Sequence, residues 1–191
     1  MRSGKELILA TKPYAKEVRW KSWYYTLSTL IILVALFTGS ALIDSVYARI
    51  ACSIFAGLVL VRMFVIYHDH QHHSILYKSK IADLLFTVFG ILILVPTSIW
   101  KRTHDYHHNH NSRLFSASIG SFPIFTKEKF LSCTRRQQLA YLAIRHPLTI
   151  LFGYFSVFFY GMGIQSYISS PRRHWDSLIS IILHVAISVA I

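Results

Sequence analysis

The chain has 191 residues, of which 53% are hydrophobic and 15% are charged, and its formal net charge is +12. Because a water-soluble domain carries about 25% charged residues, this composition excludes an ordinary soluble fold and favours an integral membrane protein. Six of the 20 basic residues lie in residues 1–23, and ten lie between Lys78 and Arg145. This grouping predicts contact with anionic lipid headgroups, and no nucleic acid is expected as a partner.

Five apolar runs follow one another along the chain, and each is close to the roughly 20 residues that cross a bilayer. They are Tyr24–Ile43, Val46–Tyr67, Ile81–Trp100, Pro147–Ile168 and Trp175–Ile191. The first two runs are separated by a very short connection, which predicts a helical hairpin. The excess of Lys and Arg before the hairpin and after it predicts a cytoplasmic N-terminus and a return to the cytoplasm at His68.

The third run, Ile81–Trp100, is expected to re-enter the membrane or to lie along its surface. One crossing would place residues 68–73 and 104–110 on opposite faces, and the intervening chain is too short for two crossings. Pro96 also weakens a spanning helix, because proline has no amide donor. The segment from Asn111 to His146 is expected to lie on the cytoplasmic membrane surface.

These runs together predict an all-α, multi-pass membrane protein. We expect about four transmembrane helices and one re-entrant or interfacial hydrophobic segment, with residues 1–191 forming one domain. Both histidine-rich stretches are expected on the cytoplasmic face.

Two short stretches hold eight of the 11 histidines, namely HDHQHH at residues 68–73 and HDYHHNH at residues 104–110. Residues three or four positions apart share one face of a helix, so His68 can meet His72, and His104 can meet His107 and His108. Neutral imidazole is the commonest nitrogen ligand of transition metals. With no cysteine nearby, structural zinc and iron–sulfur clusters are disfavoured, and the pattern predicts iron, copper, zinc or nickel.

The other polar residues of the clusters leave alternatives open. His70, His73 and His110 either face away from the metal or donate hydrogen bonds to its ligands. Asp69 and Asp105 either orient ligand imidazoles or are solvated. Outside the clusters, His146 is expected at the membrane interface and His174 is expected to be a bystander in a loop.

The spacings H-x-x-x-H at His68–His72 and H-x-x-H-H at His104–His108 resemble the first two histidine boxes of the membrane fatty-acid desaturase family. The stretches WKRTHDYHHNHN and IGSFPIFT resemble bacterial members of it, and the resemblance runs from about Tyr24 onward. It implies two non-haem iron ions as cofactor, with no catalytic residue apart from the metal ligands. The implied ligands are His68, His72, His73, His104, His107 and His108.

The same resemblance implies a reaction and its partners. O2 and electrons from an external donor, such as ferredoxin or cytochrome b5, would be used to introduce a double bond into a lipid acyl chain. A third box, H-x-x-H-H, should follow the last transmembrane helix, but the sequence stops at Ile191. We therefore expect an incomplete chain that does not turn over by itself. His184, in the last run, is either a further ligand or a buried histidine packed between helices.

Two other functions remain open at this point. A membrane hydroxylase or a carotenoid-modifying oxygenase would use similar boxes. A non-enzymatic metal-binding or transport protein would place histidines along a path through the bilayer, whereas most of the histidines here lie at one interface.

Overall fold

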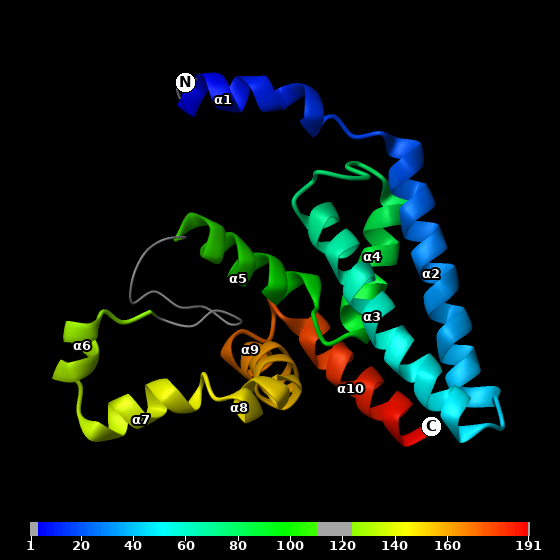
Figure 1. Ribbon diagram of the computed structural model, residues 1–191. Helices are drawn as coiled ribbons and strands as arrows, with labels where there is room; N and C mark the ends of the chain where they lie inside the picture. The colour runs from blue at the N-terminus through cyan, green and yellow to red at the C-terminus, as the bar shows by residue number, and fades with distance from the viewer. Residues whose placement is uncertain (1–3, 111–123, 191) are drawn as a thin grey trace. The chain divides into compact units, whose positions relative to one another are not determined.

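The computed structural model describes residues 4–110 and 124–190 (Figure 1). All regular secondary structure in these two ranges is helical. The expected all-α class is confirmed over this part of the chain. Residues 111–123 of the expected surface segment, most of the stretch IGSFPIFT and the final residue of the last apolar run lie outside the described residues. The chain separates into two compact units, Met1–Phe86 and Thr87–Ile191, and the single domain stays a prediction.

The first unit begins with the short helices α1 (Gly4–Thr11) and η1 (Lys12–Ala15), followed by two long helices. These are α2 (Arg19–Leu42) and α3 (Val46–Gln71), which lie side by side in Figure 1. Both are long and apolar enough to cross a membrane. The predicted hairpin is therefore confirmed as a pair of candidate spanning helices.

Two details explain why α2 and α3 pack closely at their connection. A Cβ atom on Gly39 would lie 3.0 Å from the Cys52 Sγ atom, so a larger residue would require the Cys52 side chain to move. Arg49 donates from Nε and Nη2 to the carbonyls of Ser40 and Ala41, at 2.9 and 3.2 Å. Carbonyls in the last turn of a helix lack partners within it, so Arg49 of α3 stabilises the end of α2.

The third apolar run is broken into α4 (Lys80–Leu92) and α5 (Thr97–Asn109), which are bent by 92°. At the break, Leu94 has a φ of 60°, which a residue with a side chain rarely adopts. Pro96 then precedes the first residue of α5 as its N-cap. The run is not one straight helix, and such a bend suits a broken span as well as a re-entrant segment, so the expectation that Ile81–Trp100 re-enters the membrane or lies along its surface stays a prediction.

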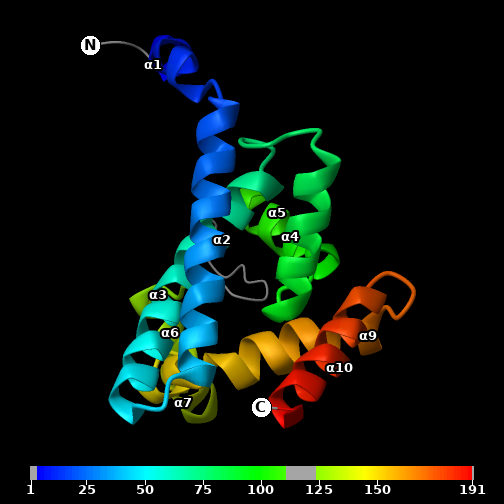
Figure 2. The same ribbon diagram turned by 90° about the vertical axis from the view of Figure 1, so that its right-hand side faces the viewer.

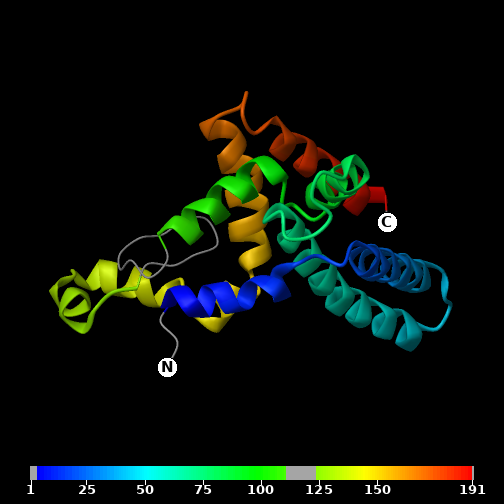
Figure 3. The same cartoon turned by 90° about the horizontal axis from the view of Figure 1, so that it is seen from above.

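The second unit continues with α6 (Lys127–Ser132) and α7 (Arg135–Ala143), and then with one long helical stretch. That stretch consists of α8 (Pro147–Leu151), η2 (Tyr154–Gln165) and α9 (Ser166–Ser169), which follow one another in Figure 3. The η2 segment is a π-helix, a form that proteins mostly use in single turns.

A short loop after α9 leads into α10 (Trp175–Ala190), as Figure 2 shows. α10 packs against α5, η2 and α9, and its serines make this contact polar. The Ser166 hydroxyl donates to Ser177 Oγ at 2.9 Å, and Ser180 donates to the Ile91 carbonyl. By length and composition, the described helices include two candidate membrane spans, or three if α4 and α5 form one broken span, so the expected number of four stays a prediction.

Candidate metal centre

The first histidine pair lies at the end of α3. His68 is in its last turn and His72 follows its final residue, because the helix continues past Tyr67 into the polar residues of the box. The two ring centroids are 4.5 Å apart, and each ring offers a nitrogen within 4.8 Å of one on the other ring. His68 Nδ1 is 3.1 Å from Asp69 Oδ1. When Nδ1 donates to that carboxylate, the neutral ring carries its lone pair on Nε2, as a metal ligand requires.

The second pair lies on α5. His104 Nε2 and His108 Nε2 are 3.0 Å apart, with the two ring centroids separated by 4.5 Å. Two nitrogens that bind one metal at a right angle, each about 2.1 Å from it, are about 3.0 Å apart. The same distance suits an N–H···N hydrogen bond between the two rings. The observed arrangement of the two Nε2 atoms therefore fits both a hydrogen bond and a shared metal ion. The Trp100 ring stacks on His104 at 4.3 Å and limits its rotation.

The other exposed histidines of the clusters have different neighbours. The His107 ring centroid is 6.2 Å from that of His104 and 5.8 Å from that of His108. The His73 ring packs on Tyr77 at 4.9 Å. His110 stacks on the ring of Tyr106 at 3.9 Å, and its Nδ1 is 2.9 Å from the Tyr106 carbonyl. Within each pair, the ring nitrogens therefore lie close enough to bind one metal ion, His68 with His72 in the first unit and His104 with His108 in the second.

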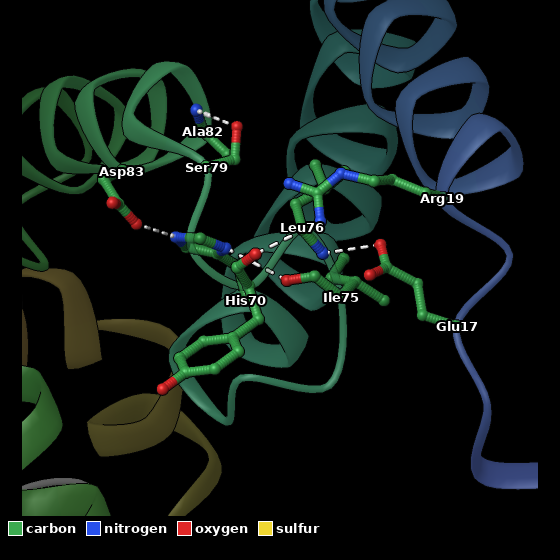
Figure 4. A network of polar contacts seen from close by, with 9 residues as sticks. Glu17, Arg19, His70, Ile75, Leu76, Ser79, Ala82 and Asp83 are labelled. Atoms are coloured by element: carbon green, nitrogen blue, oxygen red, sulfur yellow. Dashed lines mark hydrogen bonds and ion pairs between the residues drawn. The ribbon is translucent and has the colours of Figure 1, made fainter.

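His70 is buried and has a different role from its neighbours (Figure 4). Its Nε2 is 3.0 Å from Asp83 Oδ1, and its Nδ1 is 3.2 Å from the Ile75 carbonyl. Both partners are acceptors, so the ring nitrogen that carries the proton donates to one of them, and both ring nitrogens face protein oxygens. His70 instead fastens the turn after α3 to the first turns of α4, with its ring 4.7 Å from that of Phe86.

The turn that His70 fastens is strained. His73, Leu76 and Lys78 have φ angles of 58°, 51° and 60°, a region that costs side-chain-bearing residues free energy and is held only by surrounding contacts. Glu17 Oε1 accepts from the Leu76 amide at 2.6 Å, and Arg19 donates to the Tyr77 carbonyl at 3.2 Å. Figure 4 shows Glu17 reaching the turn from the segment before α2 and Arg19 reaching it from the first turn of α2. The strained turn thus begins where the first histidine pair ends.

The two acidic residues that follow the first histidine of each box have different partners. Asp69 contacts the His68 ring, as one of the two predictions proposed. Asp105 Oδ2 is instead 3.4 Å from the Lys101 ammonium, in an exposed ion pair one helical turn away. His184 belongs to α10, and its Nε2 atom hydrogen-bonds to the Tyr154 hydroxyl of η2.

His174 is a polar residue whose surroundings the sequence analysis missed. It is fully buried, and its Nδ1 is 2.8 Å from Ser98 Oγ. The Ser98 hydroxyl donates to Asp176 Oδ1 at 2.6 Å, and its amide donates to Asp176 Oδ2 at 3.1 Å. Because the hydroxyl proton goes to Asp176, His174 Nδ1 must donate to Ser98. The interaction joins residues 76 and 78 positions apart, and no local pattern signals it.

Burial lowers the pKa of His174 below its ordinary value of 6.5. The Arg102 and Arg173 guanidinium groups lower the pKa further, whereas the Asp176 carboxylate raises it. The Nε2 atom has no hydrogen-bond partner among the residues that the structure describes. Protonation would place a charged N–H there without an acceptor, which explains why the neutral ring is favoured.

Comparisons with known proteins relate the chain to enzymes of one kind. It is 31% identical over 98 residues to a fatty acid desaturase of Bacillus subtilis, which is 51% of this chain and 28% of that enzyme. It is 30% identical over 96 residues to an sn-1 oleoyl-lipid 12-desaturase of Anabaena variabilis, or 50% of this chain and 27% of the relative. An enzyme of the same name from Synechocystis is 27% identical over 127 residues, or 66% and 35%.

No family model matches the chain, and no solved structure matches it. The matched regions span about a quarter to a third of the length of these curated relatives. Over half or more of its own length, the chain is nevertheless similar to several fatty acid desaturases, which confirms the resemblance predicted from its histidine boxes.

Proposed function

We propose that this protein is an oxygen-dependent, non-haem di-iron desaturase that acts on lipid acyl chains. The observation that carries the proposal is the pair of histidine doublets, His68 with His72 and His104 with His108. Each doublet presents ring nitrogens at distances suited to one metal. The similarity to enzymes named fatty acid desaturases gives this chemistry its reaction class.

The proposed centre is shared by both doublets, with His107 and His73 as further ligands. All of its donors are imidazoles, a set that suits iron and lacks the thiolates of structural zinc sites. Iron bound there would supply the oxidising power needed to remove two hydrogens from an unactivated acyl chain with O2 and two external electrons. Asp69 would hold the His68 tautomer, and Trp100 would hold the ring of His104.

The proposed setting is a multi-pass membrane protein with both histidine boxes at the cytoplasmic interface. The distribution of Lys and Arg supports this orientation. The apolar surfaces of α2 and α3 support the membrane setting, because large side chains such as Ile31 and Leu58 are 68% and 63% exposed. A lipid-linked acyl chain is the proposed substrate, and a ferredoxin or cytochrome b5 is the proposed electron donor.

Iron content of the purified chain tests the proposal. We expect the chain to retain iron after reconstitution and dialysis, and the variant His104→Ala/His108→Ala to lose it. The control variant His110→Ala/His146→Asn also removes two imidazoles, but both lie outside the doublets, so it should retain its iron. Asn at 146 can still cap α8, where His146 Nδ1 accepts from the Leu148 amide. Equal iron in the wild type and in the His104/His108 variant would contradict the proposed metal centre.

Lipid analysis of cells that produce the protein separates the reaction types. An acyl chain that has lost two hydrogens supports desaturation. A product that retains an oxygen atom from O2 as a hydroxyl group supports the membrane hydroxylase instead. Metal that crosses vesicles without any change in their lipids supports a carrier.

A further inference from the structure

An open cleft of about 450 Å³ lies in the first unit. Lys16 from the segment before α2 and Lys21 and Ser22 from the first turns of α2 line one side of it, and Asp69 from the end of α3 and Ser74 from the turn after α3 line the other. The volume is within the range of about 300–1,000 Å³ that is usual for small-molecule sites. The proposed desaturase chemistry gives this cleft no role.

The charged groups that line the cleft differ in what they already contact. Glu17 accepts the Leu76 amide at 2.6 Å, and Asp69 is 3.1 Å from the His68 ring. In residues 4–110 and 124–190, no carboxylate oxygen lies within 4.0 Å of the ammonium group of Lys16 or Lys21. The formal charges of the lining balance, but the carboxylates have donors from the protein whereas the lysines lack ionic partners. The cleft therefore offers donors to an anion.

The cleft lies just before the apolar run of α2, at the level where a spanning helix meets lipid headgroups. Lys21 and Ser22 are in the first turns of α2, just before its apolar run. Trp20 and Tyr24 beside them are 67% and 61% exposed, as in the aromatic belts of membrane interfaces. No side chain caps the start of α2, and its first turn contains no carboxylate, so the helix dipole adds to the positive potential of the lysines.

The lining is also partly apolar, which distinguishes a lipid from a free anion. Val18, Ile66 and Ile75 line the same cleft as the two lysines. Ile66 belongs to the spanning helix α3, so an acyl chain could continue from the cleft along an apolar surface. A small soluble anion would not need these residues.

We infer that the cleft binds the phosphate of a glycerophospholipid headgroup, with the Lys16 and Lys21 ammonium groups donating to phosphate oxygens. This inference rests on the proposed function, in which that phospholipid carries the acyl chain to be desaturated. Asp69 connects the two, because it lines the cleft and also contacts the His68 ring. The substrate headgroup is thereby held beside the first histidine doublet.

Native mass spectrometry of the detergent-solubilised chain tests the inference with palmitoyl-oleoyl-phosphatidylglycerol as the probe. Loss of one charge-assisted hydrogen bond weakens binding by about tenfold or more. We therefore expect Lys16→Gln/Lys21→Gln to bind this lipid at least about tenfold more weakly than the wild type. The control Lys5→Gln/Lys12→Gln removes the same charge from the neighbouring helices α1 and η1, outside the cleft, and should bind normally.

Two further probes identify what the cleft recognises. Millimolar inorganic phosphate should not displace the phospholipid, and a monogalactosyl diacylglycerol with the same acyl chains should bind more weakly, because it has no phosphate. Equal losses in the test and control variants, equal binding of the galactolipid, or displacement by free phosphate would each overturn the inference. Iron content separates this result from the proposed function, because Lys16→Gln/Lys21→Gln should keep its iron and His104→Ala/His108→Ala should keep its lipid.

Discussion

Asp69 and Asp105 occupy the same place in the two histidine boxes, one residue after the first histidine, but they have different surroundings. Asp69 contacts the ring of His68, whereas Asp105 pairs with Lys101 on the exposed side of α5. A carboxylate that bonds to a ligand imidazole fixes its tautomer and raises its basicity. Sequence reasoning treated the two residues alike because they have the same spacing, and only the positions of the side chains separate them.

The difference predicts unequal effects on metal binding. Asp69→Asn should weaken iron affinity about 10- to 100-fold, the usual effect of losing a hydrogen-bond partner of a ligand. Asp105→Asn should leave the affinity unchanged, because an exposed ion pair contributes little. Competition with a chelator measures both affinities, and equal affinities for the two variants would contradict the role assigned to Asp69.

At the scale of helices, the start of α5 is fixed by α10. Asp176 accepts both the amide and the hydroxyl of Ser98, and buried His174 donates to the same hydroxyl. The first amides of a helix lack partners within it, so the Asp176 carboxylate satisfies one of them and favours the helix dipole. Because α5 carries His104 and His108, this network fixes the helix that presents the second doublet.

The lowered pKa of His174 predicts a pH dependence of stability. The unfolded chain takes up a proton near pH 6.5, whereas the folded chain takes it up only at lower pH. Between these two values the unfolded state binds more protons, so the free energy of unfolding decreases as the pH falls through this window. Above pH 6.5 the effect is absent.

Thermal unfolding in detergent at pH 7.5 and pH 5.5 measures this effect. The decrease in Tm on acidification should be smaller in His174→Gln than in the wild type, whatever the absolute stability of the variant. The two proteins share every other ionisable group, so the comparison isolates the effect of residue 174. An identical decrease in the two proteins would show that His174 is protonated equally easily in the folded and unfolded chains.

For the molecule as a whole, the sequence predicts best what depends on neighbouring residues. The apolar runs Tyr24–Ile43 and Val46–Tyr67 correspond to α2 and α3, although both helices extend beyond them into polar residues. Pro96 correctly indicates a break, but the left-handed backbone at Leu94 has no signal in an apolar side chain. Helical spacing likewise pairs His104 with His108, because both lie on one helix.

Contacts between distant residues were beyond such reasoning. His70 resembles its neighbours in the first box, yet Asp83 and the Ile75 carbonyl occupy both of its ring nitrogens. His174 does lie in the loop before α10, as expected, but it is not a bystander, because its ring contacts Ser98 of α5. Spacing along the chain identifies which side chains can act together, but their partners depend on how helices pack.

The central claim is that the two histidine doublets hold one shared metal centre, and iron stoichiometry tests it most directly. Iron per chain should be measured in the wild type, in His68→Ala/His72→Ala and in His104→Ala/His108→Ala. A shared centre predicts that either double variant loses nearly all tightly bound iron, because each doublet alone supplies too few ligands. If each variant retained about half of the iron, the doublets would be separate sites, and the proposed di-iron desaturase centre would be wrong.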